Sequence, residues 1–233
     1  MIDYAVKIYS IYTRLRSKSY VQKNYHERIA MARRKLKGFF FIGGANRSGT
    51  TWLRSMLNAH PQIAVQGEAR FVGNEYGVDS WLSEEGVRAW CKLPTVQKEY
   101  AAQERREEII IEMKRSIMES VLLAKWRPGV KIIGDKTPYF YCLEPEKLRR
   151  CFPESRFIHI IRDARDVAVS HHFYLLSHKD YRFYKDEQSG QKRRHYYLDG
   201  NGSPCDLFDS SSVEITAKLW REAVMGGCRA KQI

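Results

Sequence analysis

The sequence lacks several features that define common structural classes. No apolar run approaches the roughly 18–20 residues that a membrane-spanning helix needs, and the N-terminal stretch lacks the order of a secretory signal. The five cysteines are odd in number, scattered and without a Cys-x-x-Cys pair, so they indicate neither a zinc site nor a disulfide framework. We therefore expect a cytoplasmic protein with free thiols.

Acidic residues are scarce relative to basic ones. The chain of 233 residues holds 40 Lys and Arg against 27 Asp and Glu, a formal net charge of +13. This excess favours anionic partners or substrates, which include nucleotides, acidic glycans, membrane surfaces and nucleic acids. The length and a hydrophobic content of 43% suffice for one domain with a sizeable core.

Residues 1–37 carry much of the basic excess, with ten Lys or Arg against two acidic residues. Apolar residues recur among them at helical spacing, Ile8 and Tyr12 included. We interpret residues 1–37 as a basic helical arm and residues 38–233 as the main domain. Packing of the arm on the domain is the interpretation we prefer, and peripheral contact with an acidic membrane is the alternative.

The strongest local pattern runs from Phe39 to Leu57 and reads FFFIGGANRSGTTWLRSML. An apolar run, two glycines, a polar turn and a helical pattern predict a buried strand, a tight loop and a helix. Ser48, Thr50 and Thr51 bring hydroxyls near the helix N-terminus, where free N–H groups and the helix dipole attract an anion. The stretch therefore predicts a phosphate-type cradle.

The spacing of Gly44 and Gly49 fits the first half of a Walker A loop, but Thr50 stands where the Walker lysine should follow. Arg47 is the only cation within the loop. The missing lysine argues against an ordinary nucleotide triphosphatase or kinase. The alternative without a ligand is a merely tight strand–helix turn.

Apolar runs alternate with helical patterns along the rest of the chain, which predicts an α/β fold: a three-layer, P-loop-like parallel sheet flanked by helices. The further strands are expected at residues 63–65, 130–134 and 156–161, the last apolar enough to be central. The further helices are expected at residues 79–93, 99–125, 144–151, 163–178 and 213–224. The longest one is expected to carry one apolar face, formed by Ile110, Met113, Ile117, Val121 and Ala124.

Charged residues follow these strands where they end. Glu68 follows the second strand, Lys136 the third and Arg162 the fourth, with Asp163 as the expected N-cap of the next helix. Ser170 lies about two helical turns beyond Asp163 and shares its face. In an open α/β sheet the ligand crevice lies beyond the carboxyl ends of the strands, so these residues are candidates for a site.

Residues 179–212 are polar, with basic and aromatic residues alternating in part of the segment. We leave two interpretations open: a substrate lid or electrostatic funnel, and a long solvated excursion.

Two stretches together resemble the sulfotransferase family. RSGTTWL at Arg47–Leu53 resembles the loop that binds the 5′-phosphosulfate, and IRDARDVAVS at Ile161–Ser170 resembles the 3′-phosphate motif. The resemblance covers roughly residues 38–228. It implies 3′-phosphoadenosine 5′-phosphosulfate as the donor and no metal.

The resemblance also implies which residues bind the donor. These are Arg47, Ser48, Gly49, Thr50, Thr51, Trp52, Arg162 and Ser170. Arg162 and Ser170 would hold the 3′-phosphate, Trp52 would contact the adenine, and the others would form the phosphosulfate loop. An Arg fork matches a phosphate dianion and a hydroxyl adds a neutral donor.

Within the family the motifs are most similar to those of tyrosylprotein sulfotransferases. These enzymes begin the loop with Arg and use a Glu base, and here Glu68 lies twenty-one residues after Arg47. The Asp-Lys-Thr-Pro stretch around Lys136 is similar to the setting of their catalytic lysine. The resemblance thus implies Glu68 as the general base, Lys136 as the leaving-group stabiliser and Arg47 as a further catalytic cation. The structural alternatives are a capping or salt-bridged carboxylate for Glu68 and a surface lysine paired with Asp135 for Lys136.

We therefore expect a soluble sulfotransferase that moves a sulfuryl group to an acceptor hydroxyl by in-line displacement. The acceptor would be a small molecule, glycan or peptide, and nucleic acid is not an expected partner. The alternatives are a P-loop-type nucleotide kinase and a non-catalytic basic module that binds acidic membranes or nucleic acid. Family members usually continue past the last helix with an Arg-Tyr-Glu-Asp-Leu-like stretch that is missing here, so we expect a chain truncated at its C-terminal end.

Overall fold

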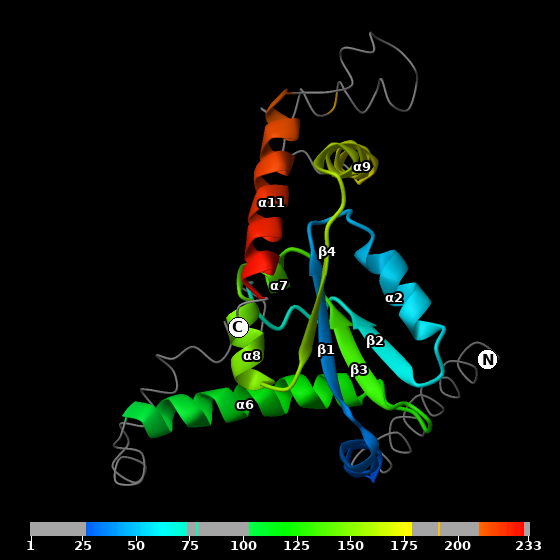
Figure 1. The fold of residues 1–233 in the computed structure, drawn as a ribbon, viewed down its shortest axis with the longest axis vertical. Coiled ribbons are helices and arrows are strands. Elements are labelled where there is room, and N and C mark those ends of the chain that lie inside the picture. The colour runs from blue at the N-terminus through cyan, green and yellow to red at the C-terminus, as the bar shows by residue number, and fades with distance from the viewer. Residues whose placement is uncertain (1–26, 74–77, 79–102, 179–190, 192–209, 231–233) are drawn as a thin grey trace, which may run out of the picture.

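The structure is a computed structural model that describes residues 27–73, 78, 103–178, 191 and 210–230 (Figure 1). The helix predicted at residues 79–93, most of the basic arm and most of the 179–212 segment lie outside the described residues. No helix in the described part of the chain has the length and apolar character required to cross a membrane.

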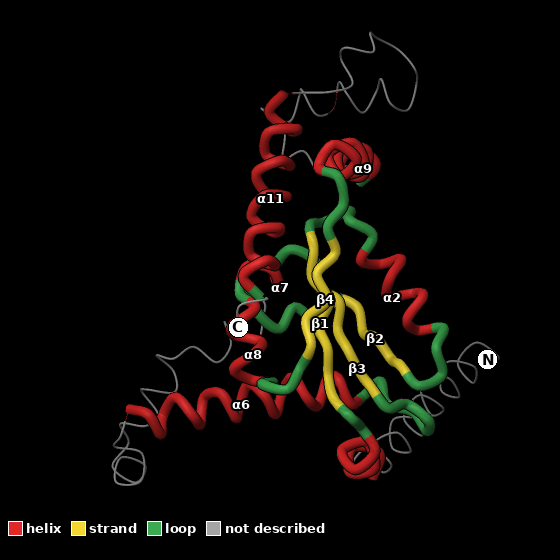
Figure 2. Tube along the Cα trace, viewed as in Figure 1, coloured by secondary structure: helices red, strands yellow, loops and turns green. Residues whose placement is uncertain are grey.

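Within the described residues, four parallel strands form the centre of the fold (Figure 2). They are β1 (Gly38–Gly44), β2 (Ile63–Gly67), β3 (Ile132–Lys136) and β4 (Arg156–Ile160), and their order across the sheet is β2-β3-β1-β4. The predicted parallel sheet is confirmed, although β3 begins and ends two residues later than expected. The predicted central position of β4 is wrong for the described sheet, where β4 lies at one edge. The apolar side chains of β4 are nevertheless packed on both faces of the sheet. Ile158 and Ile160 pack against the cluster on one face, and Phe157 packs against the cluster on the other face.

The sheet is covered by helices on both faces (Figure 1). These helices are α2 (Thr50–Asn58), α6 (Gln103–Leu123), α7 (Phe140–Leu143), α8 (Pro145–Cys151) and α11 (Ser210–Arg229), whereas α9 (Ala164–Ser177) lies beyond the carboxyl ends of the strands. Side chains alternate along a strand, so Phe41 of β1 joins the core with α6, α7 and α8. Phe40 and Ile42 face the opposite way, toward Val65 and Leu53 of α2. The three-layer α/β architecture predicted from the sequence is therefore confirmed.

The longest described helix, α6, lies within the predicted span, but its predicted apolar face is buried only in part, at Ile110 and Val121. Met113 and Ile117 are 41% and 37% exposed, whereas Met118 and Leu122 are fully buried. Apolar residues occupy neighbouring faces of this helix, so their spacing alone does not select the face that meets the sheet.

Residues 27–35, the described end of the basic arm, form a helix that packs against α6. Ala32 is fully buried in the main core, and Arg33 makes a 2.9 Å ion pair with Glu119 of α6. Arg28 donates a hydrogen bond to the carbonyl of Trp126 at 3.0 Å. This part of the arm therefore contributes to the folded core.

Candidate functional site

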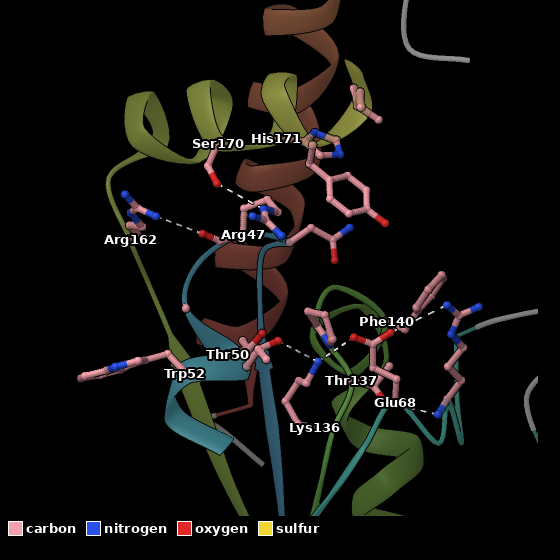
Figure 3. Close-up of a pocket in the computed structure, with 17 residues that line it drawn as sticks. Arg47, Thr50, Trp52, Glu68, Lys136, Thr137, Phe140, Arg162, Ser170 and His171 are labelled. Atoms are coloured by element: carbon pink, nitrogen blue, oxygen red, sulfur yellow. Dashed lines mark hydrogen bonds and ion pairs between the residues drawn. The ribbon is translucent and has the colours of Figure 1, made fainter. Parts of the chain in front are cut away.

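A cavity of about 550 Å³ opens where the carboxyl ends of the strands meet (Figure 3). The loop after β1, the start of α2, the turns after β2 and β3 and one face of α9 line it. The chain leaves β1 toward β2 on one side, and β4 pairs with β1 on the other. Such a switch point is where open parallel sheets bind ligands.

Nine of the ten site residues predicted from the sequence line this cavity. They are Arg47, Gly49, Thr50, Thr51, Trp52, Glu68, Lys136, Arg162 and Ser170. Ser48 is the exception, because it is buried and its hydroxyl donates to the Ala45 carbonyl at 2.6 Å. Its backbone N–H donates to the same carbonyl at 3.2 Å. Ser48 therefore shapes the loop and does not face the cavity.

The start of helix α2 is exposed to the cavity without a side-chain cap. Gly49 is its N-cap, with a left-handed φ of 96° that glycine adopts at little cost. The first turn contains no acidic residue. Its N–H groups and the positive end of the helix dipole are therefore directed toward whatever anion enters.

Two guanidinium groups and a hydroxyl converge at one end of the cavity (Figure 3). Arg47 donates from Nε to Ser170 Oγ at 3.2 Å, and Arg162 donates from Nη1 to the Arg47 carbonyl at 3.3 Å. The Arg47 guanidinium also lies over the ring of Tyr174, 5.1 Å from its centroid. These are the donors that a phosphate dianion needs, supplied by three separate segments of the chain.

An ion pair occupies the other end of the cavity. Lys136 donates from Nζ to Glu68 Oε1 at 2.6 Å and to Thr51 Oγ1 at 3.3 Å. The Lys136 side chain is only 2% exposed and the Glu68 side chain 44% exposed. Lys136 is thus not a surface lysine paired with Asp135, because the carboxylate it contacts belongs to Glu68. A potential proton acceptor and a cation therefore adjoin the N-terminal end of α2.

Asp135 is a residue to which the sequence analysis gave no role. It is fully buried, and burial raises the pKa of its carboxyl group. Its Oδ1 accepts a hydrogen bond from the Ala69 N–H at 3.2 Å, and its Oδ2 accepts from the hydroxyls of Thr137 at 2.8 Å and Tyr141 at 2.6 Å. Asp135 therefore fixes the turn that carries Glu68. The signal in the sequence was an acidic residue at the end of an apolar strand, directly before the candidate lysine.

Three of the cavity residues adopt left-handed backbone conformations without being glycine. The φ angles are 67° for Arg47, 55° for Glu68 and 51° for Arg70. Such conformations cost of order 1–3 kcal/mol each and persist where the surroundings fix them. Here the Glu68 N–H donates to the Lys136 carbonyl at 2.6 Å, and the Arg70 N–H donates to Thr137 Oγ1 at 3.2 Å. The turn after β2 is thus strained and held in place by β3.

Replacing Asp135 by Ala is expected to lower the free energy of unfolding by about 2–4 kcal/mol, since it leaves the buried Tyr141 hydroxyl and the Ala69 N–H without their acceptor. Chemical denaturation followed by circular dichroism measures this loss. Glu144→Ala is the control, because that carboxylate forms an ion pair with Lys147 near the surface at 2.7 Å, and such pairs contribute little to stability. Equal stability of the two variants would contradict the role given to Asp135.

The cavity has an excess of positive charge. Among the residues that the structure describes, the cationic side chains that line it are those of Arg47, Arg70, Lys136 and Arg162, and the carboxylate is that of Glu68, a formal net charge of +3. This balance suits a ligand that carries several negative charges.

Comparison with known proteins shows which protein family the chain is similar to. A model of the sulfotransferase family matches residues 40–200. Protein-tyrosine sulfotransferase 2 of Gallus gallus is 29% identical over 126 residues, which cover 54% of this chain and 31% of that protein. Protein-tyrosine sulfotransferase A of Caenorhabditis elegans is 28% identical over 139 residues, 57% and 32% of the two chains. Protein-tyrosine sulfotransferase 1 of Homo sapiens is 26% identical over 134 residues, 54% and 31% of the two. The chain thus spans about a third of the length of these curated relatives.

Proposed function

The chain belongs to the sulfotransferase family, and from this premise we propose that it transfers a sulfuryl group from 3′-phosphoadenosine 5′-phosphosulfate to an acceptor hydroxyl. The observation that carries the proposal is a single cavity with an arginine-lined end, an uncapped helix N-terminus and the Glu68–Lys136 pair. The family match favours this reaction over the nucleotide kinase that the loop pattern alone left open.

The residues of the cavity fit the donor. Arg162 and Ser170 would hold the 3′-phosphate, because a guanidinium and a hydroxyl provide charged and neutral donors together. Arg47 and the first N–H groups of α2 would hold the 5′-phosphosulfate. The Trp52 indole is 69% exposed at the cavity and offers a flat surface to the adenine. The formal charge of +3 would balance the negative charges of such a ligand.

Each catalytic residue has a task that its position supports. Glu68 would accept the proton of the acceptor hydroxyl, a role that typically contributes ~10²–10⁴-fold to the rate. Lys136 would donate a hydrogen bond to the oxygen on which charge develops as the leaving group departs. Arg47 would neutralise charge on the neighbouring oxygens. When bound, the donor supplies an electrophilic sulfur and a stable bisphosphate leaving group.

The relatives' names support a protein or peptide acceptor. Each of them is a protein-tyrosine sulfotransferase, so we propose a tyrosine hydroxyl as the first acceptor to test. The cytoplasmic location expected from the composition stays a prediction.

A sulfate-transfer assay with labelled donor tests the proposed function directly. Tyrosine-containing peptides, phenols and glycans are the acceptors to compare, and transfer to any of them supports the proposal. A thermal-shift screen with adenosine 3′,5′-bisphosphate and with ATP plus magnesium accompanies it. Absence of transfer, together with stabilisation by ATP and none by the bisphosphate, would return the assignment to a nucleotide kinase.

Replacing Arg162 by Ala is expected to weaken binding of adenosine 3′,5′-bisphosphate by about 10- to 100-fold, the value of a charged hydrogen bond, and to affect AMP much less. Isothermal titration calorimetry measures both affinities. Arg165→Ala is the matched control, because Arg165 lies three residues later, is highly exposed and pairs with Asp163 at 2.7 Å. Equal losses for the two nucleotides in Arg162→Ala would refute the 3′-phosphate assignment.

A further inference from the structure

Side chains of helix α11 contact three of the segments that carry the site. Among the described residues, none of those that line the cavity belongs to α11. Thr216 Oγ1 lies 3.0 Å from His171 Nδ1 on α9, and the Tyr139 hydroxyl after β3 donates to Glu222 Oε2 at 2.6 Å. Between these two contacts, Trp220 donates from its indole Nε1 to the Arg162 carbonyl at 2.8 Å.

The contact of Trp220 fixes the backbone of a candidate ligand-binding residue. Arg162 lies in the short connection between β4 and α9, and the next residue, Asp163, is the N-cap of α9. The Asp163 side chain accepts a hydrogen bond from the Arg165 N–H at 2.8 Å. The connection is therefore held at Asp163 by α9 and at Arg162 by α11. Arg162 therefore projects its side chain from a backbone that is held at two adjacent residues, and that side chain donates from Nη1 to the Arg47 carbonyl at 3.3 Å and from Nη2 to Asp166 at 3.4 Å.

The indole ring is itself held in place. Trp220 packs against the cluster of Ala45, Cys142, Val167 and Ala223, of which Ala45 belongs to the loop after β1. Two residues further along α11, Glu222 accepts from the Tyr139 hydroxyl, and burial and this carboxylate raise the pKa of Tyr139 to about 12. The indole that donates to the Arg162 carbonyl is therefore held in place by its packing against this cluster.

We propose that Trp220 is a positioning residue for Arg162, so that α11 sets the affinity of the site for a 3′-phosphate. This inference rests on the proposed function, in which Arg162 binds that group. Helix α11 would thus contribute to recognition of the nucleotide through its hydrogen bond to the Arg162 carbonyl.

The quantity to measure is the affinity for adenosine 3′,5′-bisphosphate divided by the affinity for AMP. Trp220→Phe keeps an aromatic ring and removes the N–H, and is expected to lower this ratio about five- to tenfold, the value of one hydrogen bond. Trp126→Phe is the matched control, because the Trp126 indole donates to the Val130 carbonyl at 3.1 Å in the core below the sheet and does not line the cavity. It is expected to lower stability and leave the ratio unchanged.

A double-mutant cycle separates positioning from general damage. In an Arg162→Ala background, Trp220→Phe is expected to produce no further loss in the ratio, because the side chain that it positions is gone. Both ligands are measured on the same preparation, so partial unfolding lowers both binding capacities and leaves the ratio unaffected. An unchanged ratio in Trp220→Phe, or a full additional loss in the double variant, would overturn the inference. If the unmodified protein shows no preference for the bisphosphate, the proposed function fails instead.

Discussion

Replacing Glu68 by Gln is expected to lower the turnover of sulfate transfer by at least about 100-fold, the contribution of a general base. Glutamine has nearly the same shape and keeps an oxygen that can accept the hydrogen bond that Lys136 Nζ now makes at 2.6 Å. It cannot take up the proton of an acceptor hydroxyl. The affinity for adenosine 3′,5′-bisphosphate is expected to change little, because Glu68 lies at the opposite end of the cavity from Arg162 (Figure 3). Initial rates with labelled donor and calorimetry with the bisphosphate measure the two quantities.

Glu119→Gln is the matched control for this experiment. Glu119 also pairs with a cation, at 2.9 Å from Arg33, but it lies on α6 and does not line the cavity. Its replacement is expected to leave turnover unchanged. Turnover of Glu68→Gln close to that of the unmodified protein would remove Glu68 from the mechanism, and a comparable loss in Glu119→Gln would indicate general damage.

Replacing Lys136 by Met is expected to lower turnover by about 100- to 1000-fold, the cost of losing one donor to a developing charge. Methionine fills most of the space of the nearly buried lysine side chain, so the walls of the cavity remain in place. Its partner Glu68 keeps the Arg70 guanidinium at 3.8 Å and is 44% exposed, so it can be hydrated, which limits the loss of stability. A fall in turnover with little change in KM would show that the interaction is made in the transition state.

Lys147→Met serves as the control for this substitution. Lys147 makes a comparable 2.7 Å ion pair with Glu144, but on helix α8 and away from the cavity. It is expected to retain full turnover. If Lys136→Met retains it as well, the buried lysine has a structural role and another group must stabilise the leaving oxygen.

Much of the candidate site could be predicted from the sequence because its parts follow strands directly. Glu68, Lys136 and Arg162 each come at or just after the end of a strand, and parallel strands bring their carboxyl ends to one edge of the sheet. Once the strands were recognised, the meeting of these side chains followed from topology. The loop after β1 could be predicted for a different reason, since its glycine and hydroxyl residues are neighbours in the chain.

The contacts that hold these residues in place could not be predicted, because they join distant segments. Asp135 accepts from Ala69, 66 positions away, and Trp220 donates to Arg162, 58 positions away. No spacing rule relates such pairs, and they depend on how the helices pack. Ser48 is the opposite case: it stands inside the recognised loop, yet its hydroxyl turns back to the Ala45 carbonyl, which residue type alone does not reveal.

The left-handed residues at the edge of the cavity have a consequence for engineering the protein. Arg47, Glu68 and Arg70 each hold a backbone conformation that opposes folding, and the first two carry side chains assigned to binding or catalysis. A substitution that relaxes this backbone would favour heat resistance, but it would also redirect the side chain that the conformation aims. Thermal stability and turnover are therefore in opposition at these positions, and variants selected for higher melting temperature should acquire their changes elsewhere.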